Sequence, residues 1–293
     1  MEQLVARLSD GRESFVEVRG VRLHLLRWDG DGVPFLLVHG LASNARTWEG
    51  VAAELSEAGH PVVAVNQRGH GLSDKPEQGY DFSEVTADLE ALIQSLDFTQ
   101  PLVLAGQSWG GNVALDFAVR YPRRLRGLVL VDGGFIELGA QPDATWERVS
   151  RDMRPPPLAG LRYDDIAARL RTMQPEWSEA GVQATMGNFE RFEDGTIRPW
   201  LSLDRHLQIL RALWEHRPSQ LYARVEVPTL MAVAATDDET WTARKRAALA
   251  IAESNLPNGR VVWFEQTAHD IHVHRPGELA RLMLDELREG RFQ

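Results

Sequence analysis

The sequence predicts an α/β protein with a mostly parallel central sheet of about eight strands and helices on both faces. Short apolar runs, typical of buried strands, alternate along the chain with segments of helical periodicity. Because a parallel sheet is covered on both faces, its strands read as continuous apolar runs. With 293 residues, the chain is long enough to bury a large core in one such domain that carries an insertion. The expected strands are 14–18, 21–28, 34–38, 61–66, 101–105, 125–131, 228–235 and 260–264.

The first two of these segments differ from the others in pattern. Their polar and apolar residues alternate, which predicts a hairpin of half-buried strands around Arg19 and Gly20. Between the later strands, apolar residues recur at helical spacing instead. We expect helices at 45–58, 83–96, 112–120, 242–254 and 276–289.

Residues 135–218 interrupt the alternation. They hold seven of the 15 prolines and four of the nine tryptophans. Helix-like pieces occur at 163–173 and 202–215, but there is no convincing buried strand. We therefore expect two parts, a core formed by residues 1–134 and 219–293 and a mostly helical insertion whose aromatic and methionine side chains could line an apolar pocket.

The segment Gly106-Gln107-Ser108-Trp109-Gly110 is the most informative part of the chain. It follows a buried strand, precedes a helix and matches the G-x-S-x-G nucleophile elbow. A serine on such a sharp turn projects its hydroxyl above the sheet edge. The crowded backbone requires residues without bulky side chains two positions before and after it. Ser108 is therefore the candidate nucleophile.

Two further motifs follow earlier strands. His39-Gly40-Leu41 comes after the strand at 34–38, and Gly69-His70-Gly71-Leu72-Ser73 comes after the strand at 61–66. Together with the elbow, and in this order, they resemble the α/β-hydrolase family over about residues 15–290. The resemblance implies that residues 135–218 form a helical lid, or cap, over the elbow, where a lid would exclude water and supply the substrate pocket.

A serine hydroxyl is a poor nucleophile until a base takes its proton. The segment from Ala268 to Pro276 resembles the family's Gly-His-aromatic…Arg-Pro pattern, which implies that His269 is this base. The chain carries Ala268 where the family has glycine and Asp270 where it usually has an aromatic residue. We therefore expect a more polar pocket beside the base than the family pattern would give.

The imidazole in turn needs a carboxylate that fixes its tautomer and stabilises its charged form. In the family's order of serine, acid and histidine, the acid follows the penultimate strand, and counting nine residues from Pro228 gives Asp237. Asp237 is the favoured acid. Asp238 is the neighbouring alternative, although it also reads as a cap for the next helix. Asp132 is the third candidate, because some family members place the acid at the end of the preceding strand.

The oxyanion that forms when Ser108 attacks a carbonyl needs donors that are already in place. By resemblance to the family, these are the backbone N–H groups of Leu41 and Trp109. The prediction is a serine hydrolase that cleaves a small-molecule carbonyl compound through an acyl-enzyme. A carboxylic ester or lactone is favoured, and a thioester, an amide or a carbon–carbon bond next to a carbonyl is compatible with the same residues.

Two other classes of function remain as alternatives. One is a cofactor-independent lyase, perhydrolase, haloperoxidase-like or oxygenase activity on the same triad. The other is a ligand-binding module of hydrolase fold with little turnover. Serine rather than aspartate at position 108 argues against the dehalogenase and epoxide-hydrolase branches, which use a carboxylate nucleophile.

Composition narrows the partners. The formal net charge of −10 argues against nucleic acid and anionic membranes, and no apolar stretch reaches a membrane-spanning length. The N-terminal residues lack the pattern of a signal peptide, so a cytoplasmic location is expected. The absence of cysteine excludes disulfides and thiolate metal sites. His269, His272 and His274 lack a matching acidic or cysteine partner, so no metal and no cofactor are expected, and a small-molecule substrate is the expected partner.

Overall fold

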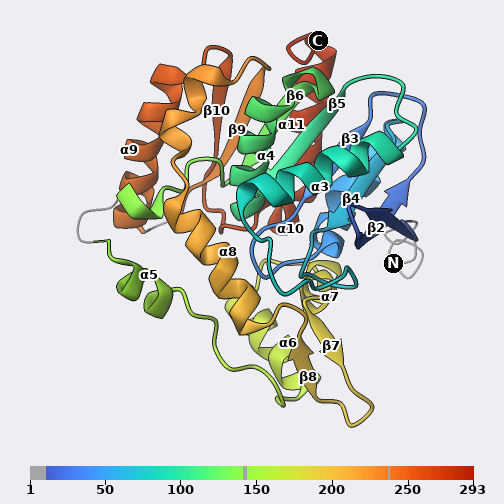
Figure 1. Cartoon of the computed structure of the whole chain (residues 1–293), viewed down its shortest axis with the longest axis vertical. Coiled ribbons are helices and arrows are strands. Elements are labelled where there is room, and N and C mark those ends of the chain that lie inside the picture. Colours follow the sequence, from blue (N-terminus) through green and yellow to red (C-terminus); the bar gives the residue numbers. More distant parts are fainter. Residues whose placement is uncertain (1–10, 141–143, 237) are drawn as a thin grey trace.

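The computed structural model describes residues 11–140, 144–236 and 238–293 (Figure 1). Within them, an eight-stranded sheet has the order β1-β2-β4-β3-β5-β6-β9-β10. β1 and β2 form an antiparallel hairpin, β2 pairs antiparallel with β4, and the strands from β4 to β10 in this order run parallel. The predicted sheet is confirmed. Its strands are β1 (Arg12–Val18), β2 (Val21–Trp28), β3 (Phe35–Val38), β4 (Val62–Asn66), β5 (Leu102–Gln107), β6 (Leu125–Val131), β9 (Thr229–Ala234) and β10 (Gly259–Phe264).

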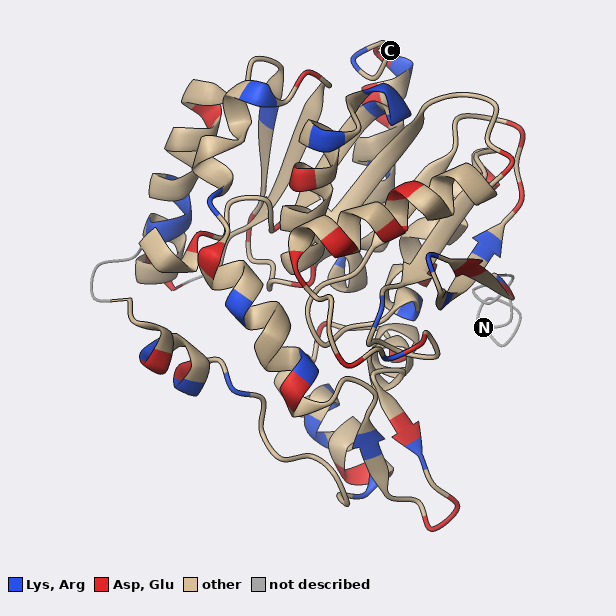
Figure 2. Cartoon of the chain, viewed as in Figure 1, with Lys and Arg blue, Asp and Glu red and all other residues tan. Residues whose placement is uncertain are grey.

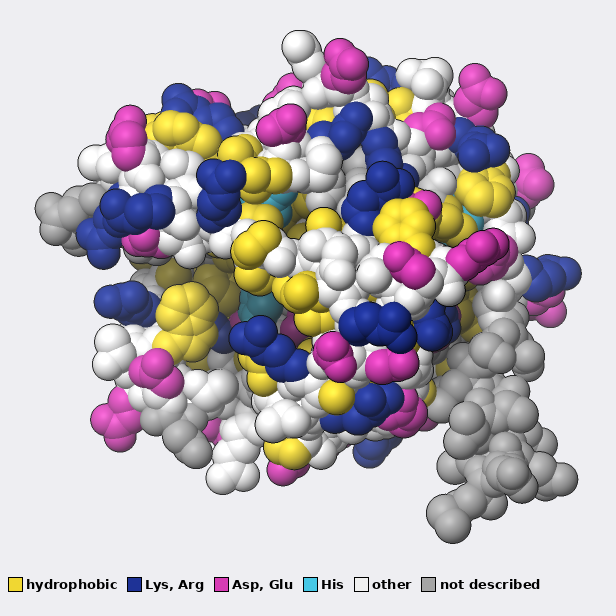
Figure 3. All heavy atoms as spheres, turned by 90° about the horizontal axis from the view of Figure 1, so that it is seen from below, with side chains coloured by type: hydrophobic (Ala, Val, Ile, Leu, Met, Phe, Trp, Pro, Cys, Tyr) yellow, Lys and Arg dark blue, Asp and Glu magenta, His cyan; other side chains and the backbone are white. Residues whose placement is uncertain are grey.

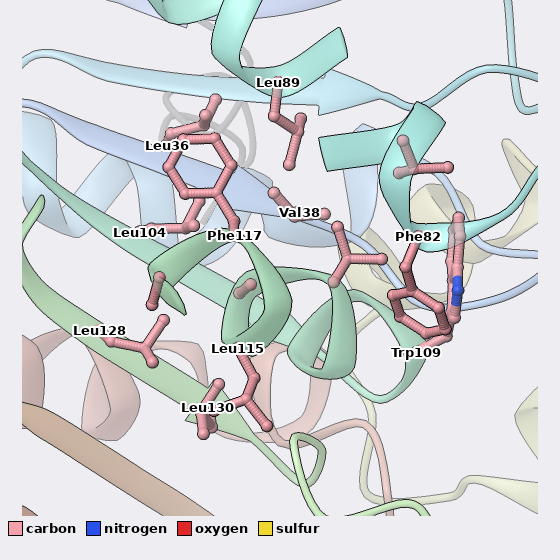
Figure 4. Packing of buried hydrophobic residues seen from close by; sticks show 14 of the residues in the cluster. Leu36, Val38, Phe82, Leu89, Leu104, Trp109, Leu115, Phe117, Leu128 and Leu130 are labelled. Carbon is pink, nitrogen blue, oxygen red and sulfur yellow. The ribbon is translucent and has the colours of Figure 1, made fainter. Parts of the chain in front are cut away.

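Helices cover both faces of the sheet. Neighbouring residues of a strand point to opposite faces, so each strand buries side chains against helices on both sides. Leu36 and Val38 of β3 belong to the same buried cluster as α3, α4 and α9, whereas Phe35 and Leu37 are buried with α2 and α11. Figure 4 shows Phe117 of α4 packed among leucines of the sheet. This two-sided burial explains the continuous apolar runs. The helices are α2 (Glu49–Glu57), α3 (Phe82–Ser95), α4 (Trp109–Arg120), α9 (Glu239–Asn255) and α11 (Pro276–Arg288).

An insertion separates β6 from β9 and lies below the sheet in Figure 1. It is mostly helical, as expected, but it also contains a short antiparallel hairpin that the sequence did not indicate. Strands of three residues are too short to show a period. The Asn44 side chain, in the loop after β3, donates a hydrogen bond to the Ala184 carbonyl of the insertion at 2.9 Å. The elements of the insertion are α5 (Trp146–Asp152), α6 (Tyr163–Met173), α7 (Glu179–Met186), β7 (Phe189–Arg191), β8 (Ile197–Pro199) and α8 (Leu203–Glu215).

Charged residues of both signs are interspersed over the helices and strands (Figure 2). The same mixture is visible on the face seen from below in Figure 3, which is also hollowed. In the described parts of the chain, no helix has the length and apolar character that a membrane crossing requires.

Candidate active site

Ser108 occupies a strained turn between β5 and α4. Its backbone angles are φ 54° and ψ −121°, a conformation that residues with a side chain rarely adopt. The Ser108 N–H donates a 2.9 Å hydrogen bond to the carbonyl of Val131, the last residue of the neighbouring strand β6. Because α4 begins at the next residue, its N-terminus lies against the serine. This is the geometry of a nucleophile elbow.

Glycines flank the serine because the surrounding backbones touch. A Cβ atom on Gly106 would lie 2.1 Å from the carbonyl oxygen of Gly110, and one on Gly110 would lie 2.5 Å from that of His39. A Cβ atom on Gly40 would lie 3.1 Å from the Ser108 Cβ. Small residues at these positions therefore allow the loop after β3 to approach the nucleophile.

His269 lies between β10 and the short helix α10 (Ile271–His274), and its Nδ1 atom is 2.6 Å from Oδ2 of Asp132. Asp132 is fully buried, whereas the imidazole of His269 is 45% exposed and thus open to a substrate. A neutral imidazole carries one proton, and when this proton is on Nδ1 the Nδ1–H donates a hydrogen bond to the carboxylate of Asp132. The acid that contacts His269 in the structure is therefore the residue at the end of β6.

The other two candidate acids stand differently. Asp238 accepts a hydrogen bond from the Trp241 N–H at 3.0 Å and caps the start of α9, which is the role its position also indicated. Asp237, the acid that the sequence favoured, lies outside the described residues. Asp132, the alternative after the preceding strand, is the only one of the three that the described hydrogen bonds join to His269.

Lys245 of α9 is a member of this cluster that the sequence analysis missed. Its Nζ atom lies 2.7 Å and 2.6 Å from the two carboxylate oxygens of Asp132 and 2.8 Å from the carbonyl oxygen of Ala234. The position of Lys245 in its helix could have indicated that the lysine is buried. The buried residues of α9 are Thr242, Lys245, Leu249 and Ala252, so a lysine stands on the helix face that packs against the core.

The electrostatics of His269 follow from these neighbours. Burial disfavours its charged form, but the hydrogen bond and the charge of Asp132, together with the charge of Asp270, raise the pKa of His269 above its ordinary value. Lys245 acts in the opposite direction and lowers it. As the pH falls, His269 therefore gains its proton at a higher pH than an ordinary histidine does.

Two buried histidines hold the loop after β3. The Nδ1 atom of His39 is 2.8 Å from the Gly40 carbonyl, and its Nε2 accepts the N–H of Gln67 at 3.1 Å. His70 accepts the N–H of Ala42 at 3.3 Å. Burial lowers the pKa of His39 to about 4 and lowers that of His70 as well, so both act as neutral hydrogen-bonding groups.

The two predicted oxyanion donors come from different segments of the chain. Leu41 belongs to the loop that these histidines hold, and Trp109 is the first residue of α4. Among the hydrogen bonds of residues 11–140, 144–236 and 238–293, none uses the backbone N–H of Leu41 or of Trp109. Both N–H groups are thus without a competing acceptor in that part of the chain.

Ser108 and His269 line the same cleft, which has a volume of about 200 Å³. The hydrogen bonds of the described residues include none between the two side chains, a contact that is often long in free enzymes. The insertion contributes polar residues to this cleft, not the aromatic and methionine side chains expected from the sequence. The cleft is lined by Gly40, Leu41, Ala42, Ser43, Thr47, Gln107, Ser108, Thr185, Asn188, His269, Asp270 and Val273.

Asp270 gives the cleft an acidic wall beside the base, as its place in the sequence led us to expect. Its Oδ1 atom accepts a hydrogen bond from the Gln107 side chain at 3.2 Å. Burial and the charge of Asp132 raise the pKa of Asp270, while His269 lowers it. Among the described residues that line the cleft there is neither lysine nor arginine.

Residues 33–276 match the family described as alpha/beta hydrolase fold, and the chain belongs to this family. A relative from Mesorhizobium japonicum, 2-(acetamidomethylene)succinate hydrolase, is 33% identical over 68% of this chain and 69% of that protein. Epoxide hydrolase A of Mycobacterium tuberculosis is 27% identical over 94% of this chain and 97% of its own length. Two other curated relatives match over shorter segments. The chain spans only 40% of the length of one of them and 34% of the length of the other.

Among solved structures, E-2-(acetamidomethylene)succinate hydrolase superimposes with a TM-score of 0.81 over 95% of this chain and 99% of that chain, at 23% identity. At this identity the likeness concerns the fold. The fold and the family model agree in placing the chain in the alpha/beta hydrolase fold family.

Proposed function

We propose that this protein is a serine hydrolase that cleaves a small carbonyl compound, a carboxylic ester or a lactone, through an acyl-enzyme on Ser108. The observation that carries the proposal is the arrangement of one cleft. Ser108 on its strained elbow and His269, paired with the buried carboxylate of Asp132, both line it. These are the parts that nucleophilic catalysis by serine requires.

The proposed reaction uses each group in turn. His269 takes the hydroxyl proton of Ser108 as the oxygen attacks the carbonyl carbon, and the backbone N–H groups of Leu41 and Trp109 bind the resulting oxyanion. Asp132 stabilises the imidazolium. The proton then passes to the leaving group, and a water molecule activated by His269 releases the acid product and restores Ser108.

The triad acid in this proposal is Asp132. Its contact with His269 at 2.6 Å supports this assignment, and so does the complete burial of its side chain. The carboxylate also accepts the backbone N–H of Ala234 at 3.1 Å, which fixes its orientation. Asp237, which the sequence favoured, stays a testable alternative.

A generic assay tests the proposed function. The protein should hydrolyse p-nitrophenyl acetate, and a fluorophosphonate probe should label it at Ser108, as identified by mass spectrometry of the labelled peptide. Labelling without turnover of any ester would favour a binding module of hydrolase fold. If Ser108 is not labelled and esters are not cleaved, the acyl-enzyme is excluded.

The polarity of the cleft supports a substrate class different from that named for the Mesorhizobium relative. A succinate derivative carries carboxylates, which cationic side chains usually recognise. The described cleft residues offer none, and Asp270 would repel such a group. We therefore place neutral or cationic acyl groups of moderate size among the substrates.

This preference predicts an order among three methyl esters of similar length. At pH 8, kcat/KM should be higher for methyl pentanoate and methyl 4-aminobutyrate than for monomethyl succinate by at least about tenfold, or ~1.4 kcal/mol. Repulsion between two charges about 4 Å apart near a protein surface exceeds this value. Acid release in a pH-stat measures all three rates.

Asp270→Asn should bring the three esters closer together, and Glu265→Gln, at an exposed site after β10, is the matched control. A wild-type enzyme that prefers monomethyl succinate would contradict the proposed role of Asp270. Hydrolysis of none of the three esters would instead count against the ester-hydrolase assignment.

A further inference from the structure

We propose that Lys245 is a positioning residue for the catalytic acid, which holds the Asp132 carboxylate in the orientation that His269 needs and offsets part of its negative charge. The proposal rests on the proposed function, in which Asp132 is the acid and His269 the base. It assigns a role in the reaction to a residue of α9 that is buried away from the substrate cleft.

The contacts of the Asp132 carboxylate fix its orientation. Oδ1 accepts hydrogen bonds from Lys245 Nζ at 2.7 Å and from the Ala234 N–H at 3.1 Å. Oδ2 lies 2.6 Å from Lys245 Nζ and 2.6 Å from His269 Nδ1. The ammonium thus bridges both oxygens, and the carboxylate is prevented from rotating about its Cβ–Cγ bond away from the imidazole.

The two charged side chains are buried together. The side chain of Lys245 is 5% exposed and that of Asp132 is fully buried. Removing two charges from water costs free energy that their attraction offsets only when geometry is good and the remaining donors are satisfied. Here the carbonyl oxygen of Ala234 accepts a further hydrogen bond from Lys245 Nζ at 2.8 Å. A lysine on the core-facing side of α9 is therefore matched to the carboxylate and not to solvent.

The charge of Lys245 acts on the protonation of His269. Among residues 11–140, 144–236 and 238–293, the charged groups that act on His269 are the carboxylates of Asp132 and Asp270 and the ammonium of Lys245. His272, on α10, is neutral because burial lowers its pKa to about 3. Without Lys245, these two carboxylates would favour the protonated imidazole, and no cation of this described set would oppose them. Lys245 therefore keeps the base neutral, and able to accept the serine proton, at lower pH.

This role differs in its consequences from that of a structural ion pair between α9 and β6. A structural pair would change the stability of the fold and leave the titration of His269 as it was. A positioning residue also changes the pH at which the base becomes protonated. The two readings separate in the pH dependence of the reaction and in the pKa of His269 measured directly.

The experiment compares Lys245→Gln, which removes the charge, with Lys245→Arg, which keeps it. Arg244→Gln, at the exposed neighbouring position on α9, is the control. For each variant, kcat/KM for p-nitrophenyl acetate is measured from pH 5 to 9. The pKa of His269 is measured by NMR on histidine-labelled protein, with the signal assigned by His269→Gln, and thermal unfolding reports stability.

In Lys245→Gln, the pKa of His269 and the acidic limb of kcat/KM should both move up by about one unit. Lys245→Arg should leave the pKa near the wild-type value and lower kcat about tenfold, because the larger planar guanidinium does not reproduce the three contacts of the ammonium. The control should change neither quantity. In an Asp132→Asn background, Lys245→Arg should lower kcat no further, because the carboxylate that the ammonium positions is no longer there.

An unchanged pKa of His269 in folded Lys245→Gln would overturn the proposal, as would a wild-type kcat in Lys245→Arg. If Lys245→Gln does not fold, Lys245→Arg and the Asp132→Asn double variant decide. Failure of the proposed function is distinguishable, because it abolishes the ester assay in wild type, while the NMR titration of His269 still reports on Lys245.

Discussion

Replacement of Ser108 by alanine is expected to lower the turnover of every ester substrate by at least ~10³-fold. The reason is chemical, because alanine has no oxygen to form the acyl-enzyme, and the remaining oxyanion donors only assist attack by water. The side chain is removed at a position where the backbone is held by the Val131 carbonyl, so the fold should persist. Steady-state kinetics and circular dichroism of the purified variant measure the two effects.

The control for this change is Ser43→Ala, which removes another serine hydroxyl from the same cleft. It should leave kcat within a few-fold of wild type, because Ser43 has no place in the acyl-transfer steps. Near-normal turnover in Ser108→Ala would remove the acyl-enzyme mechanism and favour one of the other reaction classes on this fold.

The second large effect is expected from Asp132→Asn, which should lower kcat by up to ~10⁴-fold. The asparagine amide donates a hydrogen bond where the carboxylate accepts one, so it holds His269 in the wrong tautomer and does not stabilise the imidazolium. Asp237→Asn is the matched comparison, and it should cost far less. Both variants are assayed with the same ester at the same pH.

Stability must be followed in this pair, because Asp132→Asn also leaves the buried Lys245 without its counter-charge. The double variant Asp132→Asn with Lys245→Met removes that charge, so it should recover stability without recovering activity. If Asp237→Asn is the crippling change and Asp132→Asn is mild, the acid lies after β9, as the sequence favoured.

Much of the fold could be predicted from the sequence because burial leaves a direct pattern. All eight strands of the main sheet were expected within a few residues of their observed bounds. The hairpin β1–β2 was predicted from its alternation, and the central strands were predicted from continuous apolar runs, because a strand covered on both faces is apolar along its length. The helix α6, at Tyr163–Met173, was also expected within its observed bounds. The hairpin β7–β8 and the helices α5, α7 and α10 were missed, because three to eight residues hold too little periodicity to recognise.

The choice of acid could not be made from sequence, and the reason is the parallel sheet. β6 and β9 are neighbours, with Val131 paired to Ala232, so the residues that follow either strand emerge at the same edge beside His269. The sequence supplied the candidates, and only the folded chain brought Asp132 to 2.6 Å.

The sequence by itself determined the elbow around Ser108, because a strained turn crowded by neighbouring backbones restricts its residues at fixed spacing. It also identified His269 as the candidate base and the polar character of Asp270 beside it. Tertiary structure alone decided what those groups meet. The pairing of Asp132 with His269 and Lys245, and the polar cleft completed by Thr185 and Asn188, depend on segments far apart in the chain whose packing leaves no local pattern.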